Sequence, residues 1–130
     1  RDEYIEVYTK MAEAVKNCQQ PEGYWTRSML DKNHAPGPET SGTAFFTYGI
    51  LWGINNGLLS RREYWPVVEK AWTYLTTVAL QPSGLVGYVQ PIGERAIPGQ
   101  IVDANSTSNF GVGAFLLAAC EMVRYIDARE

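Results

Sequence analysis

Apolar residues recur along the chain in four stretches that follow two alternating patterns. Residues 2–18 and 60–79 carry apolar side chains at spacings of three and four, which predicts helices with one wet face. Residues 41–56 and 108–126 are apolar or small at nearly every position, which predicts buried helices. The order amphipathic, buried, amphipathic, buried indicates two layers of helices, with the two buried helices in the inner layer.

Two long connections separate these helices. Residues 19–38 and 81–107 are rich in Pro and Gly, and connections of this length are often functional. A short strand over 84–89 is an option within the second connection. The similar motifs Gln20–Gly23 and Gln81–Gly84 each follow an amphipathic helix. The pattern therefore predicts two copies of one αα-hairpin unit, and such units bury their faces by stacking on neighbours.

Capping signals mark where the helices begin. Thr40 or Ser41 is expected to cap the first buried helix, since hydroxyl side chains accept from free backbone N–H groups. Ser60 and Glu63 have the spacing of a capping box, and Pro66 is expected to start the helix proper.

Composition excludes several classes of protein. The 130 residues form a single segment with 45% hydrophobic residues, which argues against a disordered chain. Lys plus Arg number 11 against 14 Asp plus Glu, and this net charge of −3 predicts no nucleic-acid partner. No stretch of about 20 apolar residues is expected to span a membrane.

The chain offers little for a metal or a disulfide framework. His34 is its single histidine, and no zinc-type cluster occurs, so no metal and no cofactor are expected. Cys18 and Cys120 are interpreted as buried free thiols on helices, with one bridge between them left open. Two amphipathic outer helices cannot cover two inner helices that are apolar on nearly every face, so exposed apolar surface is expected on both sides of the segment. This surface predicts self-association or a missing partner half.

Three motifs in order resemble a known enzyme family. They are Glu39–Ile50 (ETSGTAFFTYGI), Phe110–Glu121 (FGVGAFLLAACE) and Gln20–Trp25 (QPEGYW). They are similar to segments of glycoside hydrolase family 105, the unsaturated rhamnogalacturonyl hydrolases, which are related to the unsaturated glucuronyl hydrolases of family 88. The resemblance implies an all-α fold of αα-hairpins in an (α/α)6 toroid. Residues 1–130 would be its C-terminal portion, about two hairpins.

The resemblance also implies a reaction. Polysaccharide lyases leave a 4-deoxy unsaturated uronic acid on fragments of pectin or glycosaminoglycan, and these bacterial enzymes hydrate its C4=C5 bond. An Asp protonates C4 and helps deliver water to C5, and the resulting hemiketal collapses. In the family that Asp lies upstream, as does a W-x-R-G-x-G-W motif. This chain contains neither, so we expect no catalytic residue in it and no activity from it alone.

Other functions remain open. The chain could instead be a stand-alone half-toroid that binds carbohydrate or assembles with itself, or a helical-hairpin scaffold for protein partners. An unsaturated uronate-containing oligosaccharide is the expected ligand of the enzyme, and family members are often cytoplasmic, which is the expected location here.

Six residues are candidates for substrate binding, each with a purely structural alternative. They are Trp25, His34, Glu39, Thr40, Ser41 and Asp103. Three of them, Glu39, Thr40 and Ser41, lie at the N-terminus of the first buried helix. There an anion could bind the free N–H groups of the helix, or these residues could simply cap it.

The remaining candidates lie in the two connections. Trp25 could stack on a sugar ring or cover the end of a hairpin. His34 could bind a hydroxyl or carboxylate, or remain solvated. Asp103 could face the same cavity or cap the last helix. Glu94 and Arg95 are expected to be solvated.

Overall fold

The computed structural model describes residues 1–130 and contains helices but no strand. The helices are α1 (Asp2–Asn17), α2 (Thr40–Asn55), α3 (Arg61–Tyr74), the π-helical segment η1 (Leu75–Ala79) that continues α3, and α4 (Asn109–Asp127). The four predicted helices are confirmed. The optional strand over 84–89 is absent, because that segment pairs only through an isolated bridge between Leu80 and Val86.

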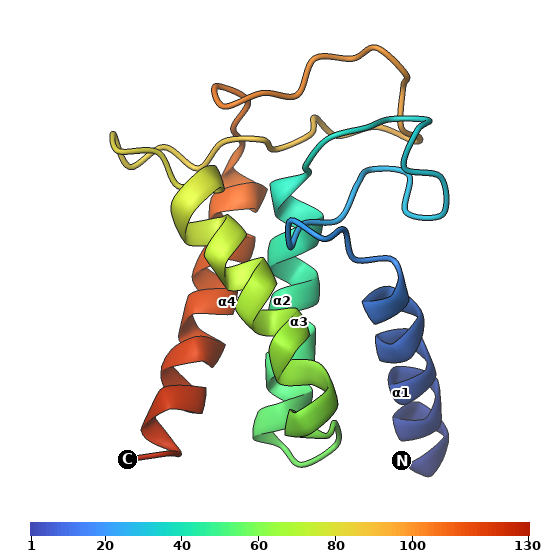
Figure 1. The fold of residues 1–130 in the computed structure, drawn as a ribbon, viewed down its shortest axis with the longest axis vertical. Helices are drawn as coiled ribbons and strands as arrows, with labels where there is room; N and C mark the ends of the chain where they lie inside the picture. The colour runs from blue at the N-terminus through green and yellow to red at the C-terminus, as the bar shows by residue number, and fades with distance from the viewer.

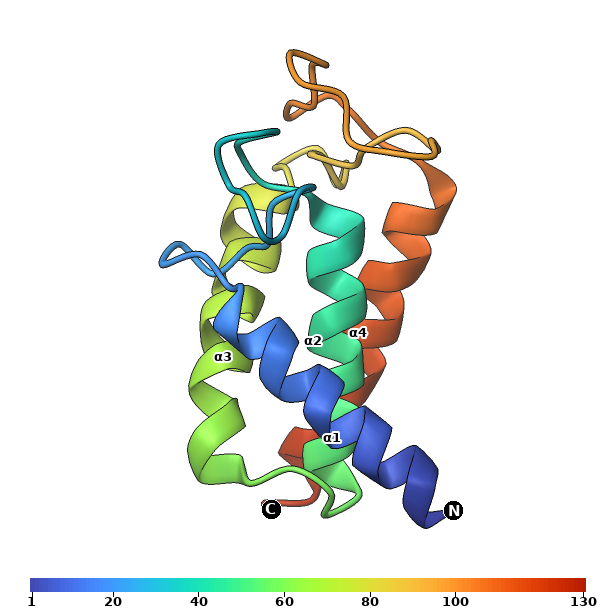
Figure 2. The same ribbon diagram turned by 90° about the vertical axis from the view of Figure 1, so that its right-hand side faces the viewer.

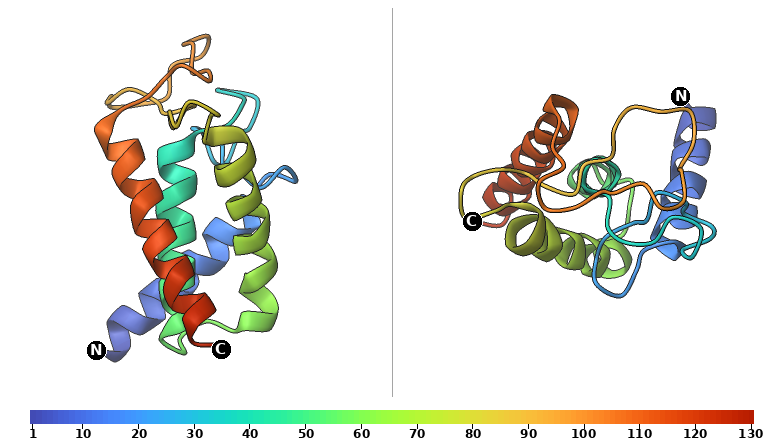
Figure 3. Two further views of the ribbon diagram at one scale, coloured as in Figure 1. Left: turned by 90° about the vertical axis from the view of Figure 1, so that its left-hand side faces the viewer. Right: turned by 90° about the horizontal axis from the view of Figure 1, so that it is seen from above.

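The helices form two layers with a common polarity in each. The inner helices α2 and α4 lie side by side, and both begin at the end of the molecule where the long connections gather (Figure 1). The outer helices run the other way: α1 crosses α2, and α3 packs along it (Figures 2 and 3). Both chain termini lie at the opposite end from the connections (Figure 1). This arrangement places the start of each inner helix beneath the connections.

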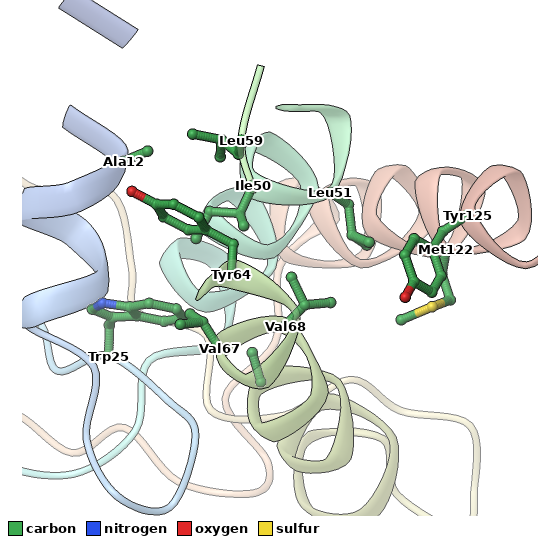
Figure 4. Close-up of a cluster of buried hydrophobic side chains, with 11 residues drawn as sticks. Ala12, Trp25, Ile50, Leu51, Leu59, Tyr64, Val67, Val68, Met122 and Tyr125 are labelled. Carbon is green, nitrogen blue, oxygen red and sulfur yellow. The ribbon is translucent and has the colours of Figure 1, made fainter. Parts of the chain in front are cut away.

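The main core lies between α1, α2, α3 and the last turns of α4 (Figure 4). Its buried residues are Ala12, Trp25, Ile50, Leu51, Leu59, Tyr64, Val67, Val68, Ala71, Met122 and Tyr125. Trp65 of α3 stacks on Tyr125 of α4 with ring centroids 4.3 Å apart. Burial of these side chains is the main force that holds the two hairpins together.

The helix starts differ from their prediction. Glu39, rather than Thr40 or Ser41, caps α2 through its side chain. Ser60 precedes α3, but the expected capping box does not form; instead the Ser60 carbonyl accepts from the N–H groups of Glu63 and Tyr64. Ser60 is still the N-cap residue, so α3 begins at Arg61, and Pro66 lies within the helix rather than at its start.

Burial of the inner helices is less complete than predicted. One face of α4 packs on α2, while Leu116, Leu117 and Val123 on its other side are about half exposed. Cys120 lies on the same helix and is exposed, contrary to prediction, whereas Cys18 is half-buried, and both thiols are free. Apolar side chains are also exposed on α1, as expected from the excess of dry surface: Tyr4, Val7 and Met11. What covers these faces stays a prediction.

The composition of α4 bears on the expectation that no segment spans a membrane. By length and apolar character alone it would suffice to cross a membrane. That evidence is weak because core helices pass the same test, and α4 lies along α2 as a core helix does.

Candidate functional site

Both long connections are fastened to the N-terminus of α2. In the first connection, Trp25 and Glu39 form an antiparallel bridge. In the second, the Tyr88 carbonyl accepts from the Thr40 N–H at 2.7 Å, and the Tyr88 N–H donates to the Asp103 carbonyl at 2.8 Å. Segments that are distant in sequence thus meet over the start of one inner helix.

Glu39 is a buried carboxylate at the centre of this junction, 2% exposed. Its Oε1 accepts from the Ser41 hydroxyl and the Gly42 N–H, both at 2.7 Å. Its Oε2 accepts from the Ser41 N–H at 3.1 Å and the Gln90 N–H at 3.0 Å. A carboxylate has about four acceptor positions, so the protein's own donors occupy them all. Glu39 is therefore placed to hold the junction together, and Ser41 is buried in the same contact.

Thr40 links α2 to the outer layer. Its hydroxyl donates to the Gly87 carbonyl at 2.6 Å and also lies 2.8 Å from the Tyr74 hydroxyl. Because the Thr40 proton is already engaged, Tyr74 is the donor in the second bond. Burial raises the pKa of Tyr74 above its ordinary range, and the hydrogen bond to Thr40 opposes this only in part. Tyr74 is consequently a neutral donor at neutral pH.

Tyr88 is the one residue other than glycine with a positive φ, 61°. Such a conformation is uncommon for a bulky residue, and here two backbone hydrogen bonds to Thr40 and Asp103 maintain it. The neighbouring Gly87 has no room for a side chain, since an added Cβ would lie 2.2 Å from the Ala104 carbonyl oxygen. The second connection is therefore folded tightly on itself above α2.

Trp25 lies in the core. It is 1% exposed, its indole N–H donates to the Val15 carbonyl at 2.7 Å, and its ring packs against Phe46 with centroids 5.2 Å apart. Its backbone N–H donates to the Thr43 hydroxyl at 3.0 Å. This packing leaves no face of the indole for a sugar ring, so Trp25 instead anchors the first connection.

His34 and Asp103 have exposed side chains, although the backbone carbonyl of Asp103 takes part in the junction through Tyr88. The imidazole of His34 makes no hydrogen bond within the chain, and only its backbone N–H is engaged, by the Asp31 carbonyl. Asp103 Oδ1 accepts from the Asn105 N–H at 2.9 Å, which shapes the loop. Asp103 does not cap α4, whose N-cap residue is Ser108.

A hollow of about 360 Å³ lies among the connections and was not predicted from the sequence. Arg27, Arg95, Gln90, Gln100 and Phe110 contribute to its wall. Arg95, which was expected to be solvated, is exposed but lines this hollow. No sequence spacing signals the site, because Arg27 and Gln100 are 73 residues apart.

The chain's buried acidic groups are engaged in structural contacts. Glu121 of α4, 1% exposed, accepts from the Asn55 side chain at 2.8 Å and pairs with Arg124. Both carboxylate oxygens of Glu39 accept hydrogen bonds from Ser41, Gly42 and Gln90. No group of three or more His, Cys, Asp or Glu side chains gathers where a metal ion could bind. Both buried carboxylates thus serve structural contacts within the chain.

Comparison with protein families gives one match that covers almost the whole chain. Residues 1–126 match the model for Glycosyl Hydrolase Family 88. Two curated relatives are each named unsaturated 3S-rhamnoglycuronyl hydrolase. The protein from Alteromonas sp. (strain LOR) is 42% identical over 95% of this chain and 29% of its own length. The protein from Formosa agariphila is 39% identical over 93% of this chain and 31% of its own length.

Solved structures agree on the fold. A structure described as a polysaccharide lyase is 75% identical, with a TM-score of 0.92 over 98% of this chain and 36% of that one. A family 88 glycosyl hydrolase from Bacteroides vulgatus is 68% identical, with a TM-score of 0.92 over 96% of this chain and 36% of that one. A possible family 105 member from Salmonella enterica has a TM-score of 0.76 at 22% identity over 94% of this chain and 32% of that one, which shows the fold alone. The expected all-α, six-hairpin fold class is confirmed, and the chain spans about a third of each relative.

Proposed function

The chain belongs to glycosyl hydrolase family 88, and from this membership we propose that the protein carrying it removes unsaturated uronic acids from oligosaccharides. The observation that supports this most directly is the match over residues 1–126, together with two relatives at 42% and 39% identity that are named as such hydrolases. Within this protein, residues 1–130 would supply two hairpins and part of the wall of the sugar site.

The proposed reaction is hydration of the C4=C5 bond. A proton is added to C4 and the hydroxyl of water to C5, which gives a hemiketal. Opening of the hemiketal breaks the C5–O5 bond of the ring and gives a ketone at C5 and a hemiacetal at C1. Collapse of this hemiacetal to an aldehyde breaks the C1–O bond to the leaving sugar, whose oxygen takes up the hemiacetal proton. The acid would come from a part of the protein outside residues 1–130, since the buried carboxylates here are engaged in structural hydrogen bonds.

A finer proposal concerns the neighbouring sugar. The resemblance to family 105 and the names of both curated relatives point to a rhamnose unit beside the unsaturated uronate. Comparing rhamnose-linked with hexosamine-linked unsaturated disaccharides tests this assignment. Equal kcat/KM on both substrates would contradict it.

The test of the main proposal follows the ultraviolet absorbance of the conjugated double bond. The complete protein is incubated with lyase-generated oligosaccharides, and the masses of the products are measured by mass spectrometry. We expect the absorbance to fall and the summed product mass to increase by one water. Residues 1–130 alone should leave the absorbance unchanged. Double-bond hydration by the isolated chain would show that it holds its own catalytic acid.

A second candidate function has one specific observation in its favour, the 75% identical structure described as a polysaccharide lyase. A lyase would create the double bond rather than consume it. With intact, saturated polysaccharide as substrate, a lyase makes the absorbance rise and a hydrolase leaves it unchanged. If neither substrate reacts, a binding or self-assembling module becomes the better reading, and sedimentation would then measure its assembly.

A further inference from the structure

One arginine in the wall of the hollow, Arg27, is held in place by hydrogen bonds. Arg27 is half-buried, and its Nη1 donates to Gln100 Oε1 at 3.0 Å while its Nη2 donates to the Gln100 carbonyl at 3.3 Å. These bonds use two of the five N–H donors of the guanidinium. The side chain is thereby held in one orientation without a ligand, and its remaining N–H donors are available to bind one.

The charge balance of the hollow favours an anion. Arg27 and Arg95 contribute two positive charges to the wall, and Glu94 contributes one negative charge. The ion pairs of the chain are Lys10–Glu6 and Arg124–Glu121, so neither arginine of the hollow is neutralised by a carboxylate. A guanidinium remains charged at any physiological pH, and its planar fork matches the geometry of a carboxylate or a sulfate.

The wall also has an apolar side. Phe110, in the first turn of α4, is half-buried there, and the exposed residues Ile92 and Ile97 lie along the same wall. A sugar ring presents C–H groups on its faces and polar substituents at its edges. An aromatic ring beside two arginines therefore suits a sugar that carries an oxyanion.

We propose that this hollow binds the oxyanion, a carboxylate or a sulfate ester, of one sugar unit of an acidic oligosaccharide. Arg27 and Arg95 are the residues that contact the anion, and Phe110 contacts the ring. That the ligand is a sugar rests on the proposed function; the preference for an oxyanion rests on the two arginines. Gln100 is a positioning residue, because it acts through Arg27.

Arginine labelling tests the site without relying on activity. The complete protein is treated with phenylglyoxal, and the modification of each arginine is followed by peptide mass spectrometry. Probes are an oligosaccharide with both carboxylate and sulfate, its desulfated form, its carboxyl-reduced form and its fully neutral form. We expect anionic probes to protect Arg27 and Arg95, and the neutral form to protect neither. Arg62, exposed at the start of α3 at the other end of the fold, is the control.

The pattern of protection identifies the anion. Protection lost on desulfation assigns the sulfate, and protection lost on carboxyl reduction assigns the carboxylate. Equal labelling of Arg27 and Arg95 with and without every anionic probe would overturn the proposal. Protection of the arginines without turnover would support the anion subsite and contradict the proposed hydrolase activity. Turnover without protection would support the hydrolase activity and contradict the subsite.

Binding by variants gives a second readout. Isothermal titration with the acidic oligosaccharide should show about tenfold weaker binding for Arg95→Ala and for Arg27→Lys, since each loses charge-assisted contacts. Arg62→Ala should bind like the wild type. Arg95 makes no hydrogen bond or ion pair in the structure, so its truncation tests binding without disturbing the fold. Affinities within twofold of the wild type for both variants would contradict the proposal.

Discussion

The carboxylate of Glu39, which caps α2, also accepts a hydrogen bond from the backbone N–H of Gln90, 51 residues later, at 3.0 Å. One side chain thus completes the first turn of an inner helix and holds the second connection over it. Gln90 in turn lines the hollow with Arg27 and Arg95. The cap of the helix and the shape of the proposed subsite therefore depend on the same carboxylate.

Replacing this carboxylate should be costly. Glu39→Gln puts an amide N–H₂ where the structure needs an acceptor, so one buried backbone donor loses its partner. We expect the free energy of unfolding of the complete protein to fall by about 2–3 kcal/mol. Urea denaturation measures this. Glu69→Gln, at an exposed position of α3, is the matched control and should change the value by less than about 0.5 kcal/mol.

Gly53 lies where α1 crosses α2, and its substitution should destabilise the crossing. An added Cβ would lie 1.9 Å from the Tyr8 hydroxyl oxygen and 2.8 Å from Leu59. Gly to Ala in a helix normally gains about 1 kcal/mol, but we expect Gly53→Ala to lose about 1–3 kcal/mol through overpacking.

Two comparisons isolate the cause. Gly49→Ala, in the same helix with nothing within 4 Å of its added Cβ, should not destabilise. The double variant Tyr8→Phe/Gly53→Ala should lose less than the sum of the single losses, because Phe lacks the hydroxyl oxygen that the Cβ meets. Strict additivity in thermal unfolding would show that the clash is not with Tyr8.

Tyr8 should make stability depend on alkaline pH. Burial, and secondarily the neighbouring Tyr64, raise the pKa of Tyr8 from 10.0 to about 12. Above pH 10 the unfolded chain loses this proton while the folded chain retains it. Stability is therefore fully present below pH 10 and falls as pH rises towards 12.

The Tyr8→Phe variant measures that contribution. It loses the hydrogen bond from the Tyr8 hydroxyl to the Gly49 carbonyl, which we expect to cost about 1 kcal/mol at pH 7. Between pH 10 and 12 its free energy of unfolding should decline less steeply than that of the wild type. Parallel curves from urea titrations across this range would contradict the assignment.

Arg124 should matter more than its surface position suggests. Its partner Glu121 is 1% exposed, so Arg124→Ala leaves a buried carboxylate with only Asn55 as a side-chain donor. We expect a loss of about 1–3 kcal/mol in the free energy of unfolding. The control is Lys10→Ala, which breaks the exposed Lys10–Glu6 pair and should cost at most about 0.5 kcal/mol. Equal losses would show that burial of Glu121 is unimportant.

The sequence by itself determined the four helices, their two-layer order and the positions of the long connections. These follow from local periodicity, because a helix repeats its contacts every three or four residues and each pattern is complete within one segment. The motifs beginning at Gln20, Glu39 and Phe110 also sufficed to indicate the fold class, and they pointed to family 105, a relative of the family 88 that the chain matches. Periodicity could not say that one side of α4 stays exposed, because that depends on which helices surround it.

Only the tertiary structure decided the roles of individual side chains at the junction. Glu39 rather than Thr40 caps α2, because its second carboxylate oxygen finds the Gln90 N–H on another connection. Trp25 is a core residue because Val15 and Phe46 converge on it. These contacts join segments distant in sequence, and spacing along the chain carries no information about which of them meet.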